Sequence, residues 1–388
     1  VPLEEAFARL AQIRAPRGPP ATDNNRKNIK TPADSSAPGG SNWPTPPAAA
    51  PGGPGATPRS SSPARSLCAR PSQMCCATPA HLPRFARSAH PTARRSLRSA
   101  RMPRSAGCLW GAVILATACG GAINARVVRV TPYEITVNKS AGSMESMKVV
   151  LLADLHLGYN VGLAQMERMV ARVNEQDADV VVIAGDIFDN AWEAVEEPEQ
   201  IAAVLRGIRS RYGVYAVYGN HDIEEPILAG FTFRSDGKKQ SSPEMDAFLA
   251  SANIRLLRDE AVLLGGEVYL YGRPDAQRPG RGIEVRKTPA ELVEGLDTDK
   301  PILVLDHQPR ELEALAEAGV DVDLCGHTHD GQMFPGNLTV RLFWENACGC
   351  LRVGSMHSIV TSGVGLFGPN MRVATRAEIC PITIHFMN

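Results

Sequence analysis

Five short polar motifs, each placed directly after an apolar run, constrain this sequence more than any other feature. The runs are rich in Val, Ile and Leu, as in residues 180–184, which is typical of strands buried on both faces. In an open α/β sheet, ligand sites gather at the carboxyl ends of strands, so we expect the motifs to converge in space. They read Asp154-Leu-His156, Gly185-Asp186-Ile-Phe-Asp189, Gly219-Asn220-His221-Asp222, an isolated His307, and Gly326-His327-Thr-His329.

Apolar spacing predicts that the domain begins with a strand, a helix and a second strand. Residues 148–153 form a continuous apolar run, and residues 162–176 carry Met166, Met169, Val170 and Val173 at helical spacing. The run at 180–184 is the next strand. Further strands are predicted within 127–137 and at 214–218, 268–271, 302–305 and 322–325.

The residue types of the motifs indicate a site for two metal ions. Asp oxygens together with His nitrogens suit Mn, Fe, Zn or a similar divalent ion, whereas an all-oxygen site would favour Mg or Ca. Two ions about 3.5–4 Å apart need a shared ligand, so one of the Asp residues is expected to bridge them. Each motif alone is a weak signal, because a lone His is usually structural or exposed. Five of the seven His after residue 106 belong to the set, which favours a common site.

This order of motifs resembles the calcineurin-like metallophosphoesterase superfamily. The resemblance covers residues from about 127 to 386, and the runs 147–158, 326–332 and 362–369 resemble its membrane-anchored or exported bacterial branch. It implies an α/β fold, a four-layer sandwich of two mixed β-sheets flanked by helices. It also implies a pair of divalent ions held by seven residues: Asp154, His156 and His329 on the first ion, Asp186 as the bridge, and Asn220, His307 and His327 on the second.

The resemblance gives His221 a catalytic role, in which it protonates or stabilises the leaving oxygen. Asp222 would orient that imidazole or raise its pKa, and a cap on the loop is the alternative for this carboxylate. For Asp189 two roles are equally compatible with the sequence: a hydrogen bond that supports a metal ligand, or the formation of a turn. The family's usual Gly after the last motif is Asp330 here. Asn190 and Asp189 replace the Arg of protein Ser/Thr phosphatases and the Tyr of purple acid phosphatases, so neither subtype is favoured.

An uncharged segment at residues 106–125 follows a flank rich in Arg, including Arg101 and Arg104. This pattern predicts a signal sequence or a membrane anchor, and a buried helix of the domain is the alternative. The sequence is compatible with three kinds of export signal: a cleavage site after Ala118, a lipoprotein-type Cys119, and a twin-Arg signal at Arg94. We therefore expect the protein to be anchored in the cell membrane or exported. The positive flank on the N-terminal side of the segment predicts that the catalytic domain lies outside the cytoplasm.

Residues 1–105 form a low-complexity tail that we expect to be disordered, because it has too little apolar periodicity to bury a core. It holds 18 of the 30 Pro, and 16 of the 41 Lys and Arg against 4 of the 41 Asp and Glu. Met102 offers an alternative start that would leave residues 1–101 untranslated. The metallophosphoesterase domain is then residues 127–388.

The remaining chain has 25 basic and 37 acidic residues, which argues against nucleic acid as a partner, since phosphate neutralisation needs clustered cations. We predict a metal-dependent phosphoesterase that cleaves phosphodiester or pyrophosphate bonds with a metal-activated hydroxide. A lipid-linked phosphoester is one candidate for its substrate. A non-catalytic metal-binding or scaffold module is the alternative. The oligomeric state is not indicated.

Substrate clues are few. The loop 366–369 and the run 342–344 are candidates for an apolar entrance, and core packing is their alternative. Arg273, Arg281 and Arg286 are candidates for contact with phosphate oxygens, or else are solvated.

Overall fold

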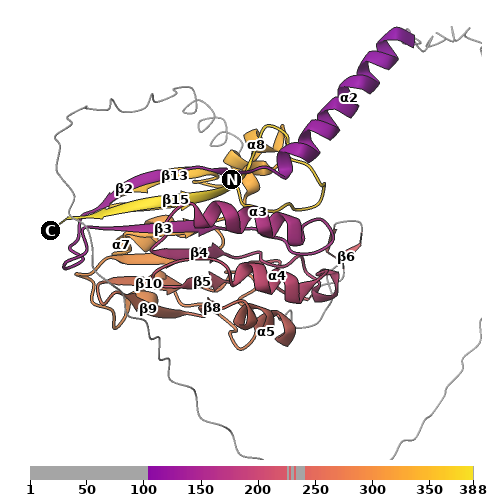
Figure 1. The fold of residues 1–388 in the computed structure, drawn as a ribbon. Helices are drawn as coiled ribbons and strands as arrows, with labels where there is room; N and C mark the ends of the chain where they lie inside the picture. The colour runs from indigo at the N-terminus through magenta and orange to yellow at the C-terminus, as the bar shows by residue number, and fades with distance from the viewer. Residues whose placement is uncertain (1–103, 225–226, 229–230, 233–240, 388) are drawn as a thin grey trace, which may run out of the picture. The chain divides into compact units, whose positions relative to one another are not determined.

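Residues 104–224, 227–228, 231–232 and 241–387 are described by a computed structural model, and they form two mixed β-sheets with helices. The tail predicted over residues 1–105 lies outside the described residues except for its last two positions. The expectation of a four-layer α/β sandwich is confirmed, as the following layers show (Figure 1).

The first sheet has the strand order β1-β15-β3-β4-β5-β8, with β2 also paired to β15. Strands β3, β4, β5 and β8 run parallel, and β15 is antiparallel to β3, which makes the sheet mixed. Its strands are β1 Val128–Val130, β2 Tyr133–Val137, β3 Ser146–Leu152, β4 Val180–Ala184, β5 Val214–Val217, β8 Ile254–Leu256 and β15 Ala377–Phe386.

The second sheet has the order β13-β14-β12-β11-β10-β9. Its four inner strands are parallel, and the two edge strands β13 and β9 are antiparallel to their neighbours. These strands are β9 Glu260–Leu264, β10 Val268–Gly272, β11 Ile302–Leu305, β12 Val322–Cys325, β13 Gly349–Val353 and β14 Met356–Val360. A separate pair joins β6 Ile227–Leu228 to β7 Phe231–Thr232.

Three apolar layers hold the sandwich together. In β4, Val181 and Ile183 pack toward the helices of the first sheet, while Val180 and Val182 pack toward the second sheet. In β11, Leu303 faces the first sheet, with the alternate residues toward the outer helices. Burial on both faces explains why these strands read as unbroken apolar runs.

Helices cover the outer faces of both sheets. Helices α3, α4 and α5 lie along one side of the first sheet (Figure 1), and α6 and α7 share a core with the second. The predicted helix over 162–176 is α3. The helices are α3 Leu163–Asn174, α4 Pro198–Leu205, α5 Pro243–Ser251, α6 Pro289–Val293, α7 Leu312–Glu317 and α8 Gly336–Thr339, with 3-10 turns η1 Trp192–Ala194, η2 His329–Gly331 and η3 Val340–Leu342.

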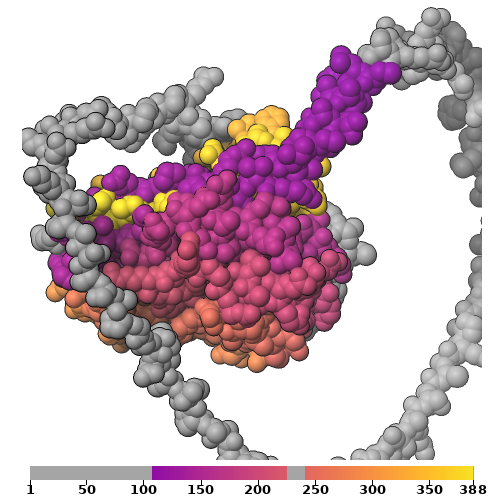
Figure 2. All heavy atoms as spheres, in the orientation of Figure 1, coloured from indigo at the N-terminus to yellow at the C-terminus, as the bar shows by residue number. Residues whose placement is uncertain are grey.

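The apolar segment forms one long helix, α2 Arg104–Ala125. Its stretch Gly107–Ala125 is long and apolar enough to cross a membrane, with a mean hydropathy of 1.6, and only 11% of that stretch is buried. In Figure 2 the helix projects from the surface of the domain. This exposure disagrees with the alternative of a buried core helix, because such a helix hides an apolar stripe inside the domain.

Candidate metal centre

The predicted ligands stand just beyond the carboxyl ends of five strands. Asp154 and His156 follow β3, Asp186 follows β4, and Asn220 follows β5, three neighbours in the first sheet. The other three residues follow β11 and β12, which are neighbours in the second sheet. Since the two sheets share a core, the ends of these strands meet and the donors converge. The second-sheet residues are His307, His327 and His329.

A first cluster joins Asp154, His156 and His329, whose ligand atoms all lie within 4.8 Å of one another. Nε2 of His156 is 3.1 Å from Nε2 of His329. Nε2 of His329 is 3.9 Å from Oδ1 of Asp154. All three residues are buried, so the cluster is a small polar group enclosed by the protein.

A second cluster joins Asp186, His307 and His327 within the same distance limit. Nε2 of His307 lies 3.2 Å from Oδ2 of Asp186 and 3.1 Å from Nδ1 of His327. The side-chain oxygen of Asn220 is 3.0 Å from Nε2 of His307, which adds the amide predicted for this group.

Asp186 lies between the two clusters. Its Oδ2 is 3.2 Å from Nε2 of His307 and 3.8 Å from Nε2 of His156. Its Oδ1 accepts a hydrogen bond from the backbone N–H of His221 at 2.8 Å. One carboxylate oxygen therefore reaches both sets of imidazoles, which is the position that a bridging ligand requires.

The donor set fits metal ions. Nδ1 of His307 donates to the carbonyl oxygen of Ala184 at 2.8 Å, which fixes the ring with Nε2 directed at Asp186 and His327. In both clusters a pair of imidazole nitrogens faces each other at 3.1 Å, an arrangement that a shared cation stabilises. Nδ1 of His156 is buried without a hydrogen-bond partner.

Burial sets the protonation of several of these groups. It lowers the pKa of His327 to about 3 and holds the pKa of His329 well below its usual range. Burial opposes ionisation of Asp186, but the neighbouring charge of His307 outweighs it and keeps the Asp186 pKa well below its ordinary value. At neutral pH the imidazoles of His327 and His329 are neutral and the carboxylate of Asp186 is charged, the protonation states that metal ligands need. Against the effect of burial, neighbouring carboxylates raise the pKa of His156 and His307.

The backbone at the site is strained. Asp154, His156 and Asp186 have φ of 53°, 47° and 50°, and His327 and His329 have φ of 72° and 51°. Left-handed backbone at residues other than Gly costs about 1–3 kcal/mol each and persists where the surroundings hold it. The strain therefore falls on five of the seven predicted ligands, as expected for a functional site.

Two glycines of the motifs are needed for close packing. A Cβ on Gly219 would lie 2.3 Å from Oδ1 of Asp186. A Cβ on Gly326 would lie 2.8 Å from Oδ2 of Asp154. Any side chain at these positions would displace a carboxylate of the clusters.

His221 lies at the edge of the centre, with Asn190 as its partner. Nδ1 of His221 is hydrogen-bonded to the side-chain oxygen of Asn190, and burial lowers the His221 pKa to about 4. Oδ1 of Asp189 is 4.0 Å from the same nitrogen and 3.6 Å from Nδ1 of His156, too far for a direct hydrogen bond to either. Sequence reasoning noted Asn190 only as a departure from another subtype, and missed this contact.

Asp222 has backbone partners. Its Oδ1 accepts from the N–H of Phe188 at 2.8 Å, and its Oδ2 accepts from the N–H of Gly219 at 2.7 Å. This geometry matches the alternative reading, a cap on the loop, since the imidazole of His221 bonds to Asn190 instead. Asp222 thus connects the loop after β4 with the loop after β5.

Arg273 differs from both sequence-based alternatives, because it is neither solvated nor open to phosphate. The side chain is completely buried and ion-paired with Asp306 and Glu311, each at 3.0 Å. Arg286 joins the same two carboxylates at 2.9 and 2.6 Å. This network lies directly before His307 and supports the end of β11.

Two cations near the centre were missed by sequence reasoning. Arg372, 1% exposed, donates through Nη2 to the carbonyl oxygens of Ser362 and Gly365 at 2.7 and 2.8 Å. The same nitrogen is 3.3 Å from Nδ1 of His329, so Arg372 supports this ligand from behind. Arg310 is exposed, and its guanidinium stacks over Trp344 at 4.6 Å. No motif marked either residue.

Aromatic rings border both sides of the centre. Phe367, 40% exposed, lies 4.8 Å from the ring of His221 and 5.9 Å from that of His156. Trp344 lies 5.0 Å from the ring of His327. The neighbouring Leu366 is buried, so the run 366–369 is divided between core packing and the border of the site.

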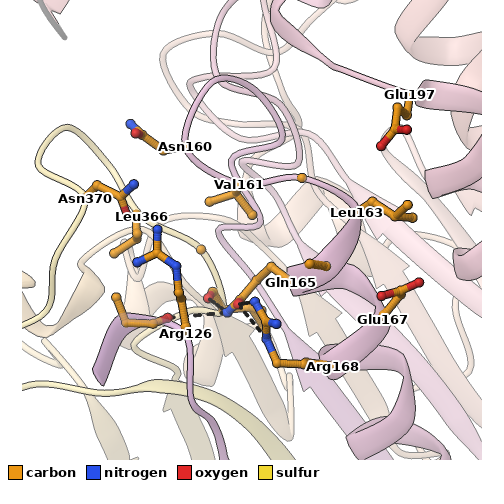
Figure 3. A pocket seen from close by; sticks show the side chains of 15 residues that line it. Arg126, Asn160, Val161, Leu163, Gln165, Glu167, Arg168, Glu197, Leu366 and Asn370 are labelled. Atoms are coloured by element: carbon orange, nitrogen blue, oxygen red, sulfur yellow. Dashed lines mark hydrogen bonds between the residues drawn. The ribbon is translucent and has the colours of Figure 1, made fainter. Parts of the chain in front are cut away.

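A pocket of about 370 Å³ lies beside the C-terminal end of α2 and the N-terminal end of α3 (Figure 3). Within it, Gln165 bonds to the carbonyl oxygen of Ala125 and accepts from Arg168. The pocket is lined by none of the predicted ligands, so we assign the chemistry to the two clusters.

Comparisons with known proteins agree with this geometry. Residues 147–331 match the family model of the calcineurin-like phosphoesterases. A "Transmembrane protein with metallophosphoesterase domain" of Danio rerio is 35% identical over 275 residues, 68% of this chain and 59% of that protein. The protein of the same name from Bos taurus is 31% identical over 66% of this chain and 56% of its own length. The chain thus spans a little over half the length of these two relatives. An uncharacterized metallophosphoesterase of Aquifex aeolicus is 31% identical over 66% of this chain and 92% of its own length.

Proposed function

This chain belongs to the calcineurin-like phosphoesterase family, and we propose that it is a metal-dependent phosphoesterase that hydrolyses phosphodiester or pyrophosphate bonds. The observation that supports this most directly is the position of Asp186. Its Oδ2 lies within 4 Å of imidazole nitrogens from both clusters, which suits a pair of ions clamping one phosphoryl group.

We assign a role to each donor. The cluster containing Asp154 would hold one ion, the cluster containing His307 would hold the other, and Asp186 would contact both. When bound, such ions polarise the phosphoryl group and supply an activated hydroxide at neutral pH. The first ion takes Asp154, His156 and His329, and the second takes Asn220, His307 and His327.

His221 would act on the leaving oxygen. Its hydrogen bond to Asn190 occupies Nδ1 and fixes the ring, so Nε2 is the atom that meets substrate. Asp222 would serve the reaction indirectly, by holding the backbone of Phe188 and Gly219 on either side of the centre. Asp222 is therefore a positioning residue in this proposal.

We also propose that the protein acts at a membrane, on a lipid-linked phosphoester. Helix α2 is long and apolar enough to span a bilayer, and two relatives are named transmembrane proteins. Cationic residues precede the helix, which would leave the catalytic domain outside the cytoplasm. The rings of Phe367 and Trp344 beside the clusters suit an apolar substituent on the substrate.

The test is a hydrolysis screen of the full chain in detergent, with manganese, iron or zinc added. Phosphomonoesters, bis-p-nitrophenyl phosphate and nucleotide-lipid pyrophosphates are compared. We expect turnover of a diester or pyrophosphate that disappears with chelator and returns with metal. Hydrolysis of monoesters alone would refute the proposed bond type. A purified protein with no tightly bound ion and no turnover would favour the scaffold alternative.

A further inference from the structure

Two segments of the described chain, helix α2 and residues 334–343, carry most of the large apolar side chains that are exposed. Among the large apolar residues exposed in the described part of the chain, six lie on α2. Three more lie within residues 334–343, namely Phe334 at 61%, Leu338 at 54% and Phe343 at 79% exposure. We call these three residues the apolar rim. Soluble surfaces seldom expose several such side chains close together without a partner.

The C-terminal turn of α2 is fixed to the domain by polar contacts. The carbonyl oxygen of Gly121 accepts from the N–H of Arg372 at 3.0 Å. The amide of Asn124 donates to the carbonyl oxygens of Arg372 and Thr375 at 3.0 and 2.9 Å. Gly121 also packs closely, since a Cβ there would lie 3.0 Å from Val373. The segment 371–375 is therefore held at the end of the helix.

The apolar rim continues from that same segment. The N–H of Phe334 donates to the carbonyl oxygen of Val373 at 3.0 Å, and Met333 forms a β-bridge with Val373. Residues 334–343 then pass through α8 and η3, with α8 near the lower end of α2 in Figure 1. The segment 371–375 therefore contacts both the last turn of α2 and the first residue of the rim, Phe334.

The rim also leads to the metal centre. Phe343 is followed by Trp344, whose ring lies 5.0 Å from that of His327. On the other side of the centre, Gln332 donates to the carbonyl oxygen of Phe367 at 2.8 Å, and Phe367 packs on His221. One continuous segment, residues 332–344, therefore connects the end of α2, the rim and both borders of the site.

We propose that the apolar rim inserts into the bilayer surface beside α2, so that the metal centre receives its substrate from the membrane plane. Aromatic and aliphatic side chains beside an anchor helix partition into the boundary between headgroups and acyl chains. The substrate class that follows is a phosphoester in a lipid headgroup. This deepens the proposed function and rests on it for the chemistry.

A bilayer fits the rim better than a second copy of the chain. Through residues 371–375 the rim is linked to a helix whose own exposed side chains, such as Ile114 at 67% and Leu115 at 65%, need an apolar environment. A membrane that covers the helix also reaches the residues bonded to its last turn. A protein partner would have to cover the rim without support from the helix.

The first experiment locates the rim in the full chain reconstituted into vesicles of phosphatidylcholine and phosphatidylglycerol. A photoreactive benzophenone amino acid replaces Phe343 in one variant. In the matched control it replaces Leu263, which is 43% exposed and lies on β9, the edge of the second sheet opposite β13. We expect lipid crosslinks from position 343 and few from position 263. Equal labelling at both positions, or crosslinked dimers from position 343, would overturn the proposal.

The second experiment separates docking from catalysis. Phe334→Ser and Phe343→Ser are combined and compared with Leu263→Ser on soluble bis-p-nitrophenyl phosphate and on a p-nitrophenyl phosphodiester carrying two acyl chains in the same vesicles. We expect the rim variant to lose about tenfold on the vesicle substrate only, because two apolar side chains no longer insert. An unchanged ratio of the two rates would contradict docking, whereas a wild-type protein inactive on both substrates would contradict the proposed function.

Discussion

The side-chain oxygen of Asn190 is hydrogen-bonded to Nδ1 of His221, across 31 positions of the sequence. Asn190 is 1% exposed and has φ of 59°, so a buried and strained residue holds the imidazole beside Asp186. The contact links the loop after β4 to the loop after β5, as Asp222 does through backbone groups.

Asn190→Gly should lower kcat by about 10- to 100-fold with little change in KM, because the imidazole loses the group that orients it. Glycine accepts the left-handed backbone, so the variant should fold. Asn190→Asp keeps both the acceptor oxygen and the tolerance for this backbone, and it should recover most of the rate. Steady-state kinetics on bis-p-nitrophenyl phosphate decide this. Equal loss in both variants would show that the contact does not position His221.

His221→Ala should reduce turnover by about 100-fold or more while leaving the metal content unchanged, because the imidazole is assigned to the leaving oxygen and to neither ion. Elemental analysis of the purified variant, read beside its turnover with manganese, separates these two effects. Near-normal hydrolysis by the variant would remove His221 from the mechanism.

Asp186→Asn should lose both activity and bound metal, since the amide offers one neutral oxygen where the carboxylate reaches both clusters. We expect at least about a 100-fold loss of turnover, and a melting temperature that no longer responds to added manganese. The far-UV circular dichroism spectrum in chelator should match that of the wild type, which would show that the fold is intact. A variant that retains two ions per chain would contradict the bridging assignment.

Asp323→Asn should flatten the dependence of stability on pH. Burial, with a smaller contribution from the charge of Asp306, raises the pKa of Asp323 to about 7. A raised pKa means that the folded state prefers the protonated carboxyl, so this contribution to stability is complete below the unfolded pKa of about 4. It is lost as pH rises toward 7.

Urea unfolding at pH 5 and pH 8 measures this effect. The amide introduced by Asp323→Asn cannot titrate, so the difference in unfolding free energy between the two pH values should be smaller in the variant by a few kcal/mol at most. The carboxylate of Asp323 is held by Ser358 and Cys325, and the variant's absolute stability can change for that reason. Parallel pH curves for both proteins would show that Asp323 is ionised throughout.

Much of the site could be predicted because its donors follow strands buried on both faces. The run at 180–184 is β4 to the residue, and the run at 302–305 is β11. Such runs are visible in a sequence since every position is apolar. By contrast, Arg273 carries no sign of its burial, which depends on the carboxylates of Asp306 and Glu311 reaching it from other segments. The partners of Asp222 and His221 were likewise set by how two loops pack.

Which side chains stand at strand ends follows from the order of residues alone, because the alternation of apolar runs and polar motifs is a local property of the chain. Which donors meet depends on how the two sheets pack. Asp186 of the first sheet lies 3.2 Å from His307 of the second, although 121 positions separate them in the sequence. That distance exists because Val182 and Leu303 pack in one core between the sheets, and the packing of two faces is a property of no single segment.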